Sequence, residues 1–202
     1  MDSKSLTQFD LYLSGERADS NLTTRNSFLT QVYSAANWIQ GQFVDSGFTV
    51  TQGSFQSSYG PNVIAKRGTT YPNTYVMIGG HYDSRALNSA SGIARAPGAN
   101  DDGSGTSALL EIARLIGDNN VQFKYSVILG AWCGEEQGPV GSRAYAKKSR
   151  DSGVDIRAMI QGDMLAYRVP GERLQVAFPN RYHTPHPHRP GQGHHQHLRP
   201  RH

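Results

Sequence analysis

The sequence contains very little cysteine and no long apolar run, and each shortage excludes a class of protein. Cys133 is the one cysteine among 202 residues, so the chain can form neither an internal disulfide framework nor a structural zinc site of the cysteine type. No stretch comes near the roughly 18 consecutive apolar residues of a membrane-spanning helix. The first 20 residues lack the apolar core of a signal peptide, so we expect neither a signal peptide nor a membrane partner.

The excess of basic over acidic residues is also small, and it lies at one end of the chain. Lys and Arg number 20 against 16 Asp and Glu, a formal net charge of +4. Arg189, Arg199 and Arg201 fall in the last 20 residues, where no acidic residue offsets them. The remainder is nearly neutral and offers no basic stripe, so we expect no nucleic-acid partner.

The last twenty residues differ in composition from the rest. Residues 183–202 hold seven of the eight histidines, four of the ten prolines and one apolar side chain, Leu198. Such a segment buries too little apolar surface to offset the entropy of ordering it. We therefore expect a domain over residues 1–182 and a disordered His/Pro-rich tail over 183–202. The abrupt change is typical of a shifted reading frame or a mispredicted exon, and a metal-binding histidine tail is the alternative.

Strand and helix patterns alternate along the body of the chain. Apolar residues at helical spacing predict a helix over about 24–45, with a buried face made of Phe28, Val32, Ala35, Ile39 and Phe43. Short apolar runs predict strands at 62–65, 75–78, 125–132, 159–160 and 174–178. Further helices are expected over 104–116, with Ser104 as a possible N-cap, and over 140–148. This alternation predicts an α/β three-layer sandwich with a mostly parallel central sheet flanked by helices.

Polar clusters follow the predicted strands, where ligands bind in sheets of this kind. The clusters contain His81 and Asp83, then Asp101 and Asp102, then Glu135 and Glu136, and finally Asp163. Each alone has an ordinary structural interpretation, as a hydrogen-bonded histidine, acids at a helix N-terminus or a turn aspartate. Together, one imidazole and several carboxylates suit zinc, manganese or cobalt. A set so rich in carboxylates also suits two metals about 3.5–4 Å apart, as in many hydrolases.

Four motifs, in this order and spacing, resemble the M28 family of zinc aminopeptidases, and especially its secreted bacterial and fungal leucine-aminopeptidase-like branch. They are GGHYDS, PGANDDGSGTSALLEIAR, GEEQGPVGS and QGDM, and the resemblance covers roughly residues 20–180. It implies a metalloprotease that hydrolyses the N-terminal peptide bond of peptides with a free N-terminus through a metal-activated water. It also implies secretion, although the sequence shows no signal peptide.

The resemblance also implies a role for each polar residue. By this resemblance, His81 and Asp163 bind the first zinc, Glu136 binds the second zinc, and Asp101 bridges the two. Glu135 is implied as the general base. Asp83 is implied to orient the His81 ring. A cis peptide bond between Asp101 and Asp102 is implied as well.

One departure from the family pattern changes the expectation for this chain. The family's fifth ligand is a histidine in the last third of the domain, and the His/Pro tail begins before any matching motif. We therefore expect an α/β domain that is incomplete at its C-terminal end and holds at most one zinc tightly. The alternative to an active enzyme is a catalytically impaired fragment or pseudo-enzyme that binds one zinc or none. Carboxypeptidases and single-zinc glutaminyl cyclases share the family resemblance, but Asp101 and the paired glutamates favour the aminopeptidase branch.

Overall fold

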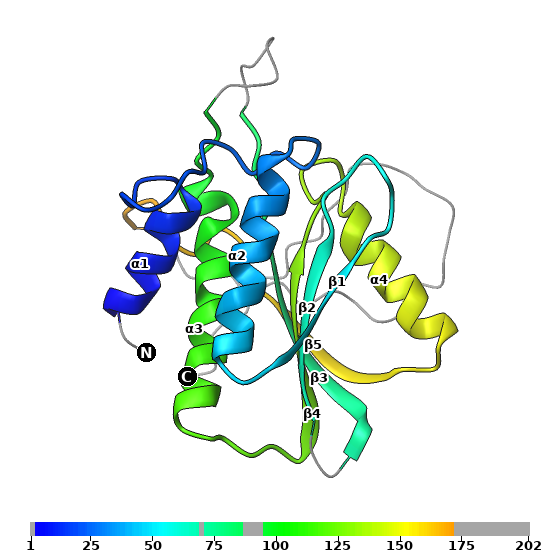
Figure 1. The fold of residues 1–202 in the computed structure, drawn as a ribbon. Helices are drawn as coiled ribbons and strands as arrows, with labels where there is room; N and C mark the ends of the chain where they lie inside the picture. Colours follow the sequence, from blue (N-terminus) through cyan, green and yellow to red (C-terminus); the bar gives the residue numbers. More distant parts are fainter. Residues whose placement is uncertain (1–2, 69–70, 87–94, 172–202) are drawn as a thin grey trace. The chain divides into compact units, whose positions relative to one another are not determined.

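The computed structural model describes residues 3–68, 71–86 and 95–171 (Figure 1). In chain order the elements are α1 (Ser3–Leu13), α2 (Gln31–Asp45), β1 (Thr49–Gly53), β2 (Asn62–Arg67), β3 (Tyr71–His81), a short π-helical turn η1 (Ala99–Gly103), α3 (Ser104–Asp118), β4 (Tyr125–Trp132), α4 (Val140–Asp151) and β5 (Asp155–Gln161). They belong to one compact unit that ends at Tyr167. The strand predicted at 174–178, the domain boundary at 182 and the tail lie outside the described residues.

The five strands form one mixed sheet in the order β1-β2-β4-β3-β5. β3 runs parallel to both β4 and β5, whereas β2 is antiparallel to β1 and to β4. The α/β fold is as predicted, but the expectation of a mostly parallel sheet holds only for its second half. The reason lies in the connections: α3 and α4 carry the chain back between parallel strands, whereas the links on either side of β2 are too short for such a crossover and reverse the chain.

Helices cover both faces of this sheet, so the three layers are confirmed. The larger core lies between the sheet and the face of α2 and α3, and it takes Val127, Leu129 and other alternate residues of β4. The smaller core lies on the opposite face, where Ile128 and Trp132 pack with Tyr145 of α4. Figure 1 shows α2 and α3 on one side of the strands and α4 on the other. Because β4 is buried on both faces, its sequence is a continuous apolar run.

The helix predicted over 24–45 begins later, at Gln31. Phe28 is therefore not part of its buried face and is 52% exposed. Side chains bond the preceding backbone instead: the Gln31 Oε1 atom accepts hydrogen bonds from the amides of Thr23 and Thr24, and the Asn26 Oδ1 atom accepts one from the Phe28 amide. Local bonds of this kind compete with helix formation, which explains the late start.

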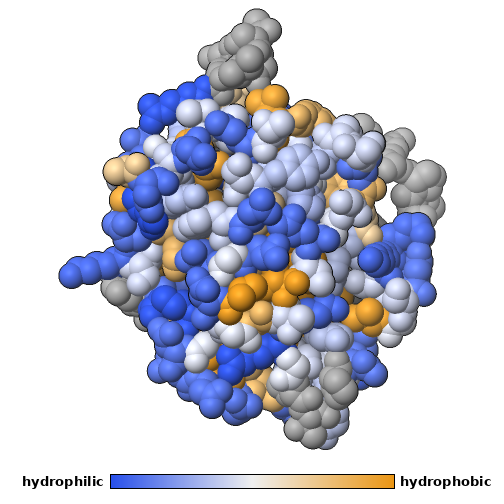
Figure 2. Space-filling model, viewed as in Figure 1, coloured by the Kyte–Doolittle hydropathy of each residue, from blue (hydrophilic) through white to orange (hydrophobic). Residues whose placement is uncertain are grey.

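Polar residues make up most of the face drawn in Figure 2. Figure 2 shows a face on which hydrophilic residues surround small, separate apolar areas. Within the described residues, no helix has the length and hydrophobicity that crossing a membrane requires.

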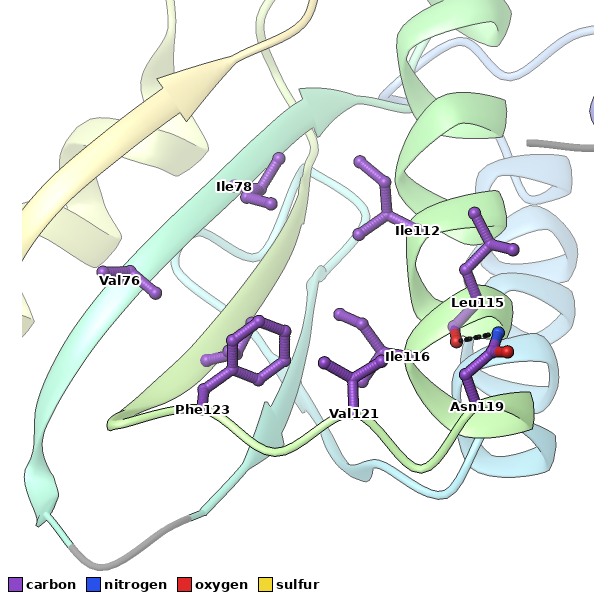
Figure 3. A pocket seen from close by; sticks show the side chains of 9 residues that line it. Val76, Ile78, Ile112, Leu115, Ile116, Asn119, Val121 and Phe123 are labelled. Atoms are coloured by element: carbon purple, nitrogen blue, oxygen red, sulfur yellow. Dashed lines mark hydrogen bonds between the residues drawn. The ribbon is translucent and has the colours of Figure 1, made fainter.

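An apolar groove of about 410 Å³ lies beside the C-terminal half of α3. Figure 3 shows Val76 and Ile78 of β3 facing Ile112 and Leu115 of α3 across it. The remaining lining residues are Ile116, Asn119, Val121, Phe123 and Val127. An incomplete sheet at the C-terminal end remains a prediction, because residues 172–202 are outside the described part.

Arg25 fastens three separate segments to one another. Its guanidinium is fully buried and donates hydrogen bonds of 2.6–3.0 Å to the backbone carbonyls of Leu13, Tyr82, Pro97 and Gly98. A buried charge is tolerated only where it is hydrogen-bonded, and here backbone dipoles supply the bonds. Arg25 thus ties the end of α1 to the residue after β3 and to the loop before η1.

Replacing Arg25 by methionine should lower the free energy of unfolding by roughly 3–5 kcal/mol, since each buried acceptor left without a donor costs about 1–3 kcal/mol. Urea unfolding followed by circular dichroism measures the loss. Arg17→Met is the control, because Arg17 forms a surface ion pair with Asp19 and should cost about 1 kcal/mol or less. Equal losses in the two variants would contradict the anchoring role of Arg25.

Candidate metal centre

The predicted site residues meet where three parallel strands end. His81, the last residue of β3, pairs with Trp132, the last residue of β4, and the last residue of β5, Gln161, pairs with Gly79. The segments that follow these strands therefore leave the sheet at one edge. This register brings together His81, Asp101, Glu135 and Asp163, which we call the strand-end site.

Two glycines allow α3 to begin directly against β3. A Cβ atom on Gly80 would lie 3.1–3.2 Å from the backbone of Gly105 and Thr106, and a Cβ atom on Gly105 would lie 2.4–2.5 Å from the Asp102 carboxylate oxygens. Because neither glycine has a side chain, the first turn of α3 can bond His81 directly. The Asp102 Oδ2 atom accepts a hydrogen bond from the His81 amide, and the Thr106 hydroxyl donates one to the His81 carbonyl.

The His81 ring is buried and its two nitrogens face different surroundings. Nδ1 lies 3.2 Å from the Asp83 carbonyl oxygen and 3.4 Å from its Oδ1 atom. Nε2 is buried without a hydrogen-bond partner among the described residues. The Asp101 Oδ1 atom lies 3.0 Å from Nε2, and carboxylate oxygens of Glu135 and Asp163 lie 3.9 Å away. An unpartnered nitrogen that faces three carboxylates is an arrangement suited to a cation.

The charges around His81 also favour a cation at this position. Burial alone lowers the pKa of His81, but the contact with Asp83 and the charges of Asp102 and Asp163 outweigh burial and raise the pKa from 6.5 to about 9. The surroundings therefore stabilise a positive charge at the ring, which a proton or a bound divalent cation can supply. Imidazole and carboxylate donors fit zinc.

Asp83 connects His81 to the segment after β4. Its carboxylate is fully buried and accepts hydrogen bonds from the Ser27 hydroxyl at 2.7 Å and from the amides of Glu135 and Glu136 at 3.2 and 3.3 Å. Burial raises the pKa of Asp83, but the bonds from His81 and Ser27 outweigh it and hold the pKa below its ordinary value. A metal-binding histidine usually has a carboxylate of this kind beside the ring nitrogen that does not face the metal, and Asp83 has that place beside Nδ1.

Asp102 is the buried member of the acidic pair. Besides the bond from the His81 amide, its carboxylate accepts hydrogen bonds from the amides of Gly105 and Met164 at 2.8 and 3.2 Å. Burial raises the pKa of Asp102 to about 7. The interpretation of Asp102 as an acid at a helix N-terminus is therefore correct. Ser104 is not the N-cap, because it is the first residue of α3 itself.

The structure also gives Asp102 a place at the site that sequence analysis missed. Oxygen or nitrogen atoms of His81, Asp102 and Asp163 lie within 4.8 Å of one another. Three amides already occupy the Asp102 oxygens, whereas the Asp101 side chain is 47% exposed. The peptide bond between the two aspartates is cis, as the family resemblance implies.

Glu135 and Asp163 line the open side of the strand-end site. Their side chains are 37% and 45% exposed, and burial and neighbouring acids raise the pKa of each above its ordinary value. Both carboxylates therefore keep a proton to a higher pH than a free surface acid does. A raised pKa is what proton transfer near neutral pH requires of a glutamate.

Glu136 lies in different surroundings from Glu135. Its side chain is only 9% exposed, and its Oε2 atom lies 3.4 Å from the Nε atom of Arg85. Arg85 is a basic neighbour that sequence analysis did not single out, although it follows the GGHYDS motif directly. A guanidinium beside the residue implied as a ligand of the second zinc already supplies a positive charge there.

With this geometry established, the comparisons identify the family. The sequence profile of peptidase family M28 matches residues 62–186. The chain belongs to peptidase family M28. The family resemblance seen in the four motifs is thereby confirmed.

Relatives of this M28 chain are longer than the chain itself. It is 34% identical to a "Probable zinc metalloprotease" of Pyrenophora teres f. teres, over 76% of the chain and 35% of that protein. It is 33% identical to "Leucine aminopeptidase 1" of Sclerotinia sclerotiorum, over 77% of the chain and 44% of that protein. The crystal structure of Legionella pneumophila LapA aminopeptidase superposes with a TM-score of 0.71 at 25% identity, over 83% of the chain and 44% of LapA. The M28 chain thus spans less than half the length of each.

The two adjacent aspartates of this M28 chain should respond differently to alanine. Asp102→Ala should lower the free energy of unfolding by about 2 kcal/mol, because buried amides lose their acceptor. Asp101→Ala should change it by only about 0.5 kcal/mol, as for an exposed position, but should abolish tight zinc binding. Urea unfolding of the metal-free chain and zinc analysis after dialysis give the two readouts. Normal zinc content in Asp101→Ala would contradict a ligand role for Asp101.

Proposed function

We propose that this chain carries a zinc-dependent centre for hydrolysis of the peptide bond next to a free N-terminus. The observation that carries the proposal is the buried Nε2 atom of His81, which faces the carboxylates of Asp101, Glu135 and Asp163 at 3.0–3.9 Å. Membership of family M28 and relatives named as zinc metalloprotease and leucine aminopeptidase support it.

His81, Asp101 and Asp163 are the residues that would hold one zinc. They supply one imidazole and two carboxylates from separate loops, and a fourth position can stay open as in catalytic zinc sites. A second zinc would have Asp101 and Glu136 among the described residues and no imidazole, and Glu136 already contacts Arg85. We therefore infer one tightly held zinc at most.

The proposed chemistry assigns proton transfer to Glu135. Bound zinc supplies Lewis-acid polarisation of a carbonyl and makes water a stronger acid. The Glu135 carboxylate takes a proton from the attacking water and then donates it to the leaving amine. The hydrogen bond from its amide to Asp83 fixes the backbone that carries Glu135.

The acidity of the strand-end site supports a preference for substrates with a free amine. Asp101, Glu135 and Asp163 bring more negative charge than one divalent cation neutralises. A protonated N-terminus is attracted to such a site, whereas an acylated N-terminus carries no charge to be attracted. The proposed substrates are therefore peptides with an unblocked N-terminus.

A specific observation favours the second candidate, a catalytically impaired chain that binds one zinc. His81 provides the sole imidazole of the strand-end site within the part of the chain that the structure describes. Hydrolysis by two metals would need a further donor. Secretion remains a prediction from the family resemblance.

Zinc titration of the full chain separates the candidates. We expect one tight zinc that is absent from His81→Ala, a variant that measures what the tail histidines bind on their own. An active centre should release p-nitroaniline from the leucine derivative and none from its N-acetyl analogue, whereas the impaired candidate should release little or none from either. Two equally tight zincs with clear turnover would contradict the impaired candidate, and equal zinc binding by His81→Ala would contradict the metal centre.

Glu135→Gln tests the proton-transfer role. The amide keeps the size of the side chain but cannot accept the proton, so any turnover of the full chain should fall about 10²–10⁴-fold. Zinc affinity should stay within a factor of a few, because Glu135 is not a proposed ligand. Glu135→Asp is the matched control, since it keeps a carboxylate and should retain more activity than the glutamine variant. Full activity in Glu135→Gln would contradict the assignment.

A further inference from the structure

We propose that Ser27 is a positioning residue of the metal centre, whose hydroxyl fixes Asp83 and, through Asp83, the ring of His81. The proposal rests on the proposed function only in requiring that zinc binds at His81. Ser27 lies before residues 62–186, the segment that the M28 profile matches, and none of the four sequence motifs includes it.

The hydrogen bond between Ser27 and Asp83 is short and buried from solvent. The Ser27 hydroxyl donates to the Asp83 Oδ2 atom at 2.7 Å, and the two residues are 1% and 0% exposed. A hydroxyl–carboxylate bond of this length is charge-assisted and stronger than a bond between neutral groups. Because both groups are buried, water has no ready access to replace the hydroxyl if it is removed.

Ser27 supplies the shortest of the bonds that orient Asp83. The amides of Glu135 and Glu136 donate to Oδ1 and Oδ2 at 3.2 and 3.3 Å, and the Nδ1 atom of His81 lies 3.4 Å from Oδ1. A carboxylate held through both oxygens cannot rotate about its Cβ–Cγ bond without breaking several contacts. Losing the Ser27 bond removes the strongest restraint on that rotation.

The backbone around Ser27 is held against the segment that carries Asp83. The Arg25 amide donates to the Ser84 hydroxyl at 3.0 Å, and the Ser84 amide donates to the Arg25 carbonyl at 3.2 Å. The Arg25 guanidinium donates to the Tyr82 carbonyl at 2.6 Å. From the other side, the Gly60 amide donates to the Ser27 carbonyl at 2.9 Å. Ser27 is therefore held in place on both sides of its bond to Asp83.

Ser27 adds one residue to the set of contacts that orient the proposed zinc ligand His81. His81 is oriented by Asp83, and Asp83 is oriented by Ser27, so the chain of contacts reaches from the N-terminal segment to Nε2. Changes to such outer partners typically cost about 10–100-fold in metal affinity. A serine that only stabilised the fold would have no such effect on zinc.

The experiment measures the zinc dissociation constant of the full chain by competition with a coloured chelator. Ser27→Ala should weaken zinc binding about 10–100-fold. Ser149→Ala is the matched control, because Ser149 is also buried, 7% exposed, but lies on α4. It should leave the zinc affinity unchanged.

Two further variants separate the hydroxyl from the space it fills. Ser27→Thr and Ser27→Val have nearly equal volume and differ in the hydroxyl, so threonine should bind zinc more tightly than valine. Where a variant is unfolded without zinc, the zinc concentration at half refolding, followed by circular dichroism, replaces the dissociation constant and should give the same order.

The zinc affinities of these variants either support or overturn the positioning role of Ser27. Equal zinc affinity in wild type and Ser27→Ala, or in the threonine and valine variants, would overturn the positioning role, provided that His81→Ala is impaired. If His81→Ala binds zinc as tightly as wild type, the metal centre itself fails, and that result is distinct from a failure at Ser27.

Discussion

The buried carboxylate of Asp83 is charged, and the site can exist only because that charge is fully hydrogen-bonded. An isolated carboxylate removed from water is far too costly to keep ionised. Here a hydroxyl from the N-terminal segment, two amides from the segment after β4 and the His81 ring share the carboxylate. The same bonds that make the charge tolerable also fix the geometry, because the donors come from three different parts of the chain. Satisfying one anion thus aligns three segments.

Arg25 has the complementary role for the backbone. Its buried guanidinium binds carbonyl oxygens rather than a carboxylate directly, yet Asp10 and Asp83 are close enough to stabilise its charge. Desolvation lowers the pKa of Arg25 to about 10, so the group stays cationic at neutral pH. The buried cation of Arg25 and the buried anion of Asp83, which is bonded by Ser27 two residues after Arg25, together hold loops that lie outside the sheet.

The strand-end site contrasts with this satisfied interior. Asp101, Glu135 and Asp163 are partly exposed and crowd one unpartnered nitrogen, an arrangement that is unfavourable without a cation. The charged groups that are hydrogen-bonded therefore lie in the interior behind the strand-end site, and the unbalanced negative charge lies at its open face. This division is what a binding site requires, since a ligand can gain only from groups that the fold has not already satisfied.

The sequence by itself determined the layered α/β fold, the places of β2 to β5 along the chain and the acidic residues around His81, because apolar periodicity and the four motifs are local signals, whereas the predicted strands at 75–78 and 159–160 are longer in the structure, at Tyr71–His81 and Asp155–Gln161. It did not reveal α1, of which Leu13 is the one buried residue, or β1, whose five residues are exposed or only half buried. The residues alone did not separate Asp101 from Asp102, a distinction that only the family resemblance implied: in the structure the two differ because Asp102 is buried and accepts hydrogen bonds from amides that include one from α3. The antiparallel half of the sheet, the contact of Arg85 with Glu136 and the bond from Ser27 to Asp83 were decided by the tertiary structure alone. The Ser27 bond joins residues 56 positions apart, and such a pairing leaves no periodic trace in the chain because it depends on how the segments pack together.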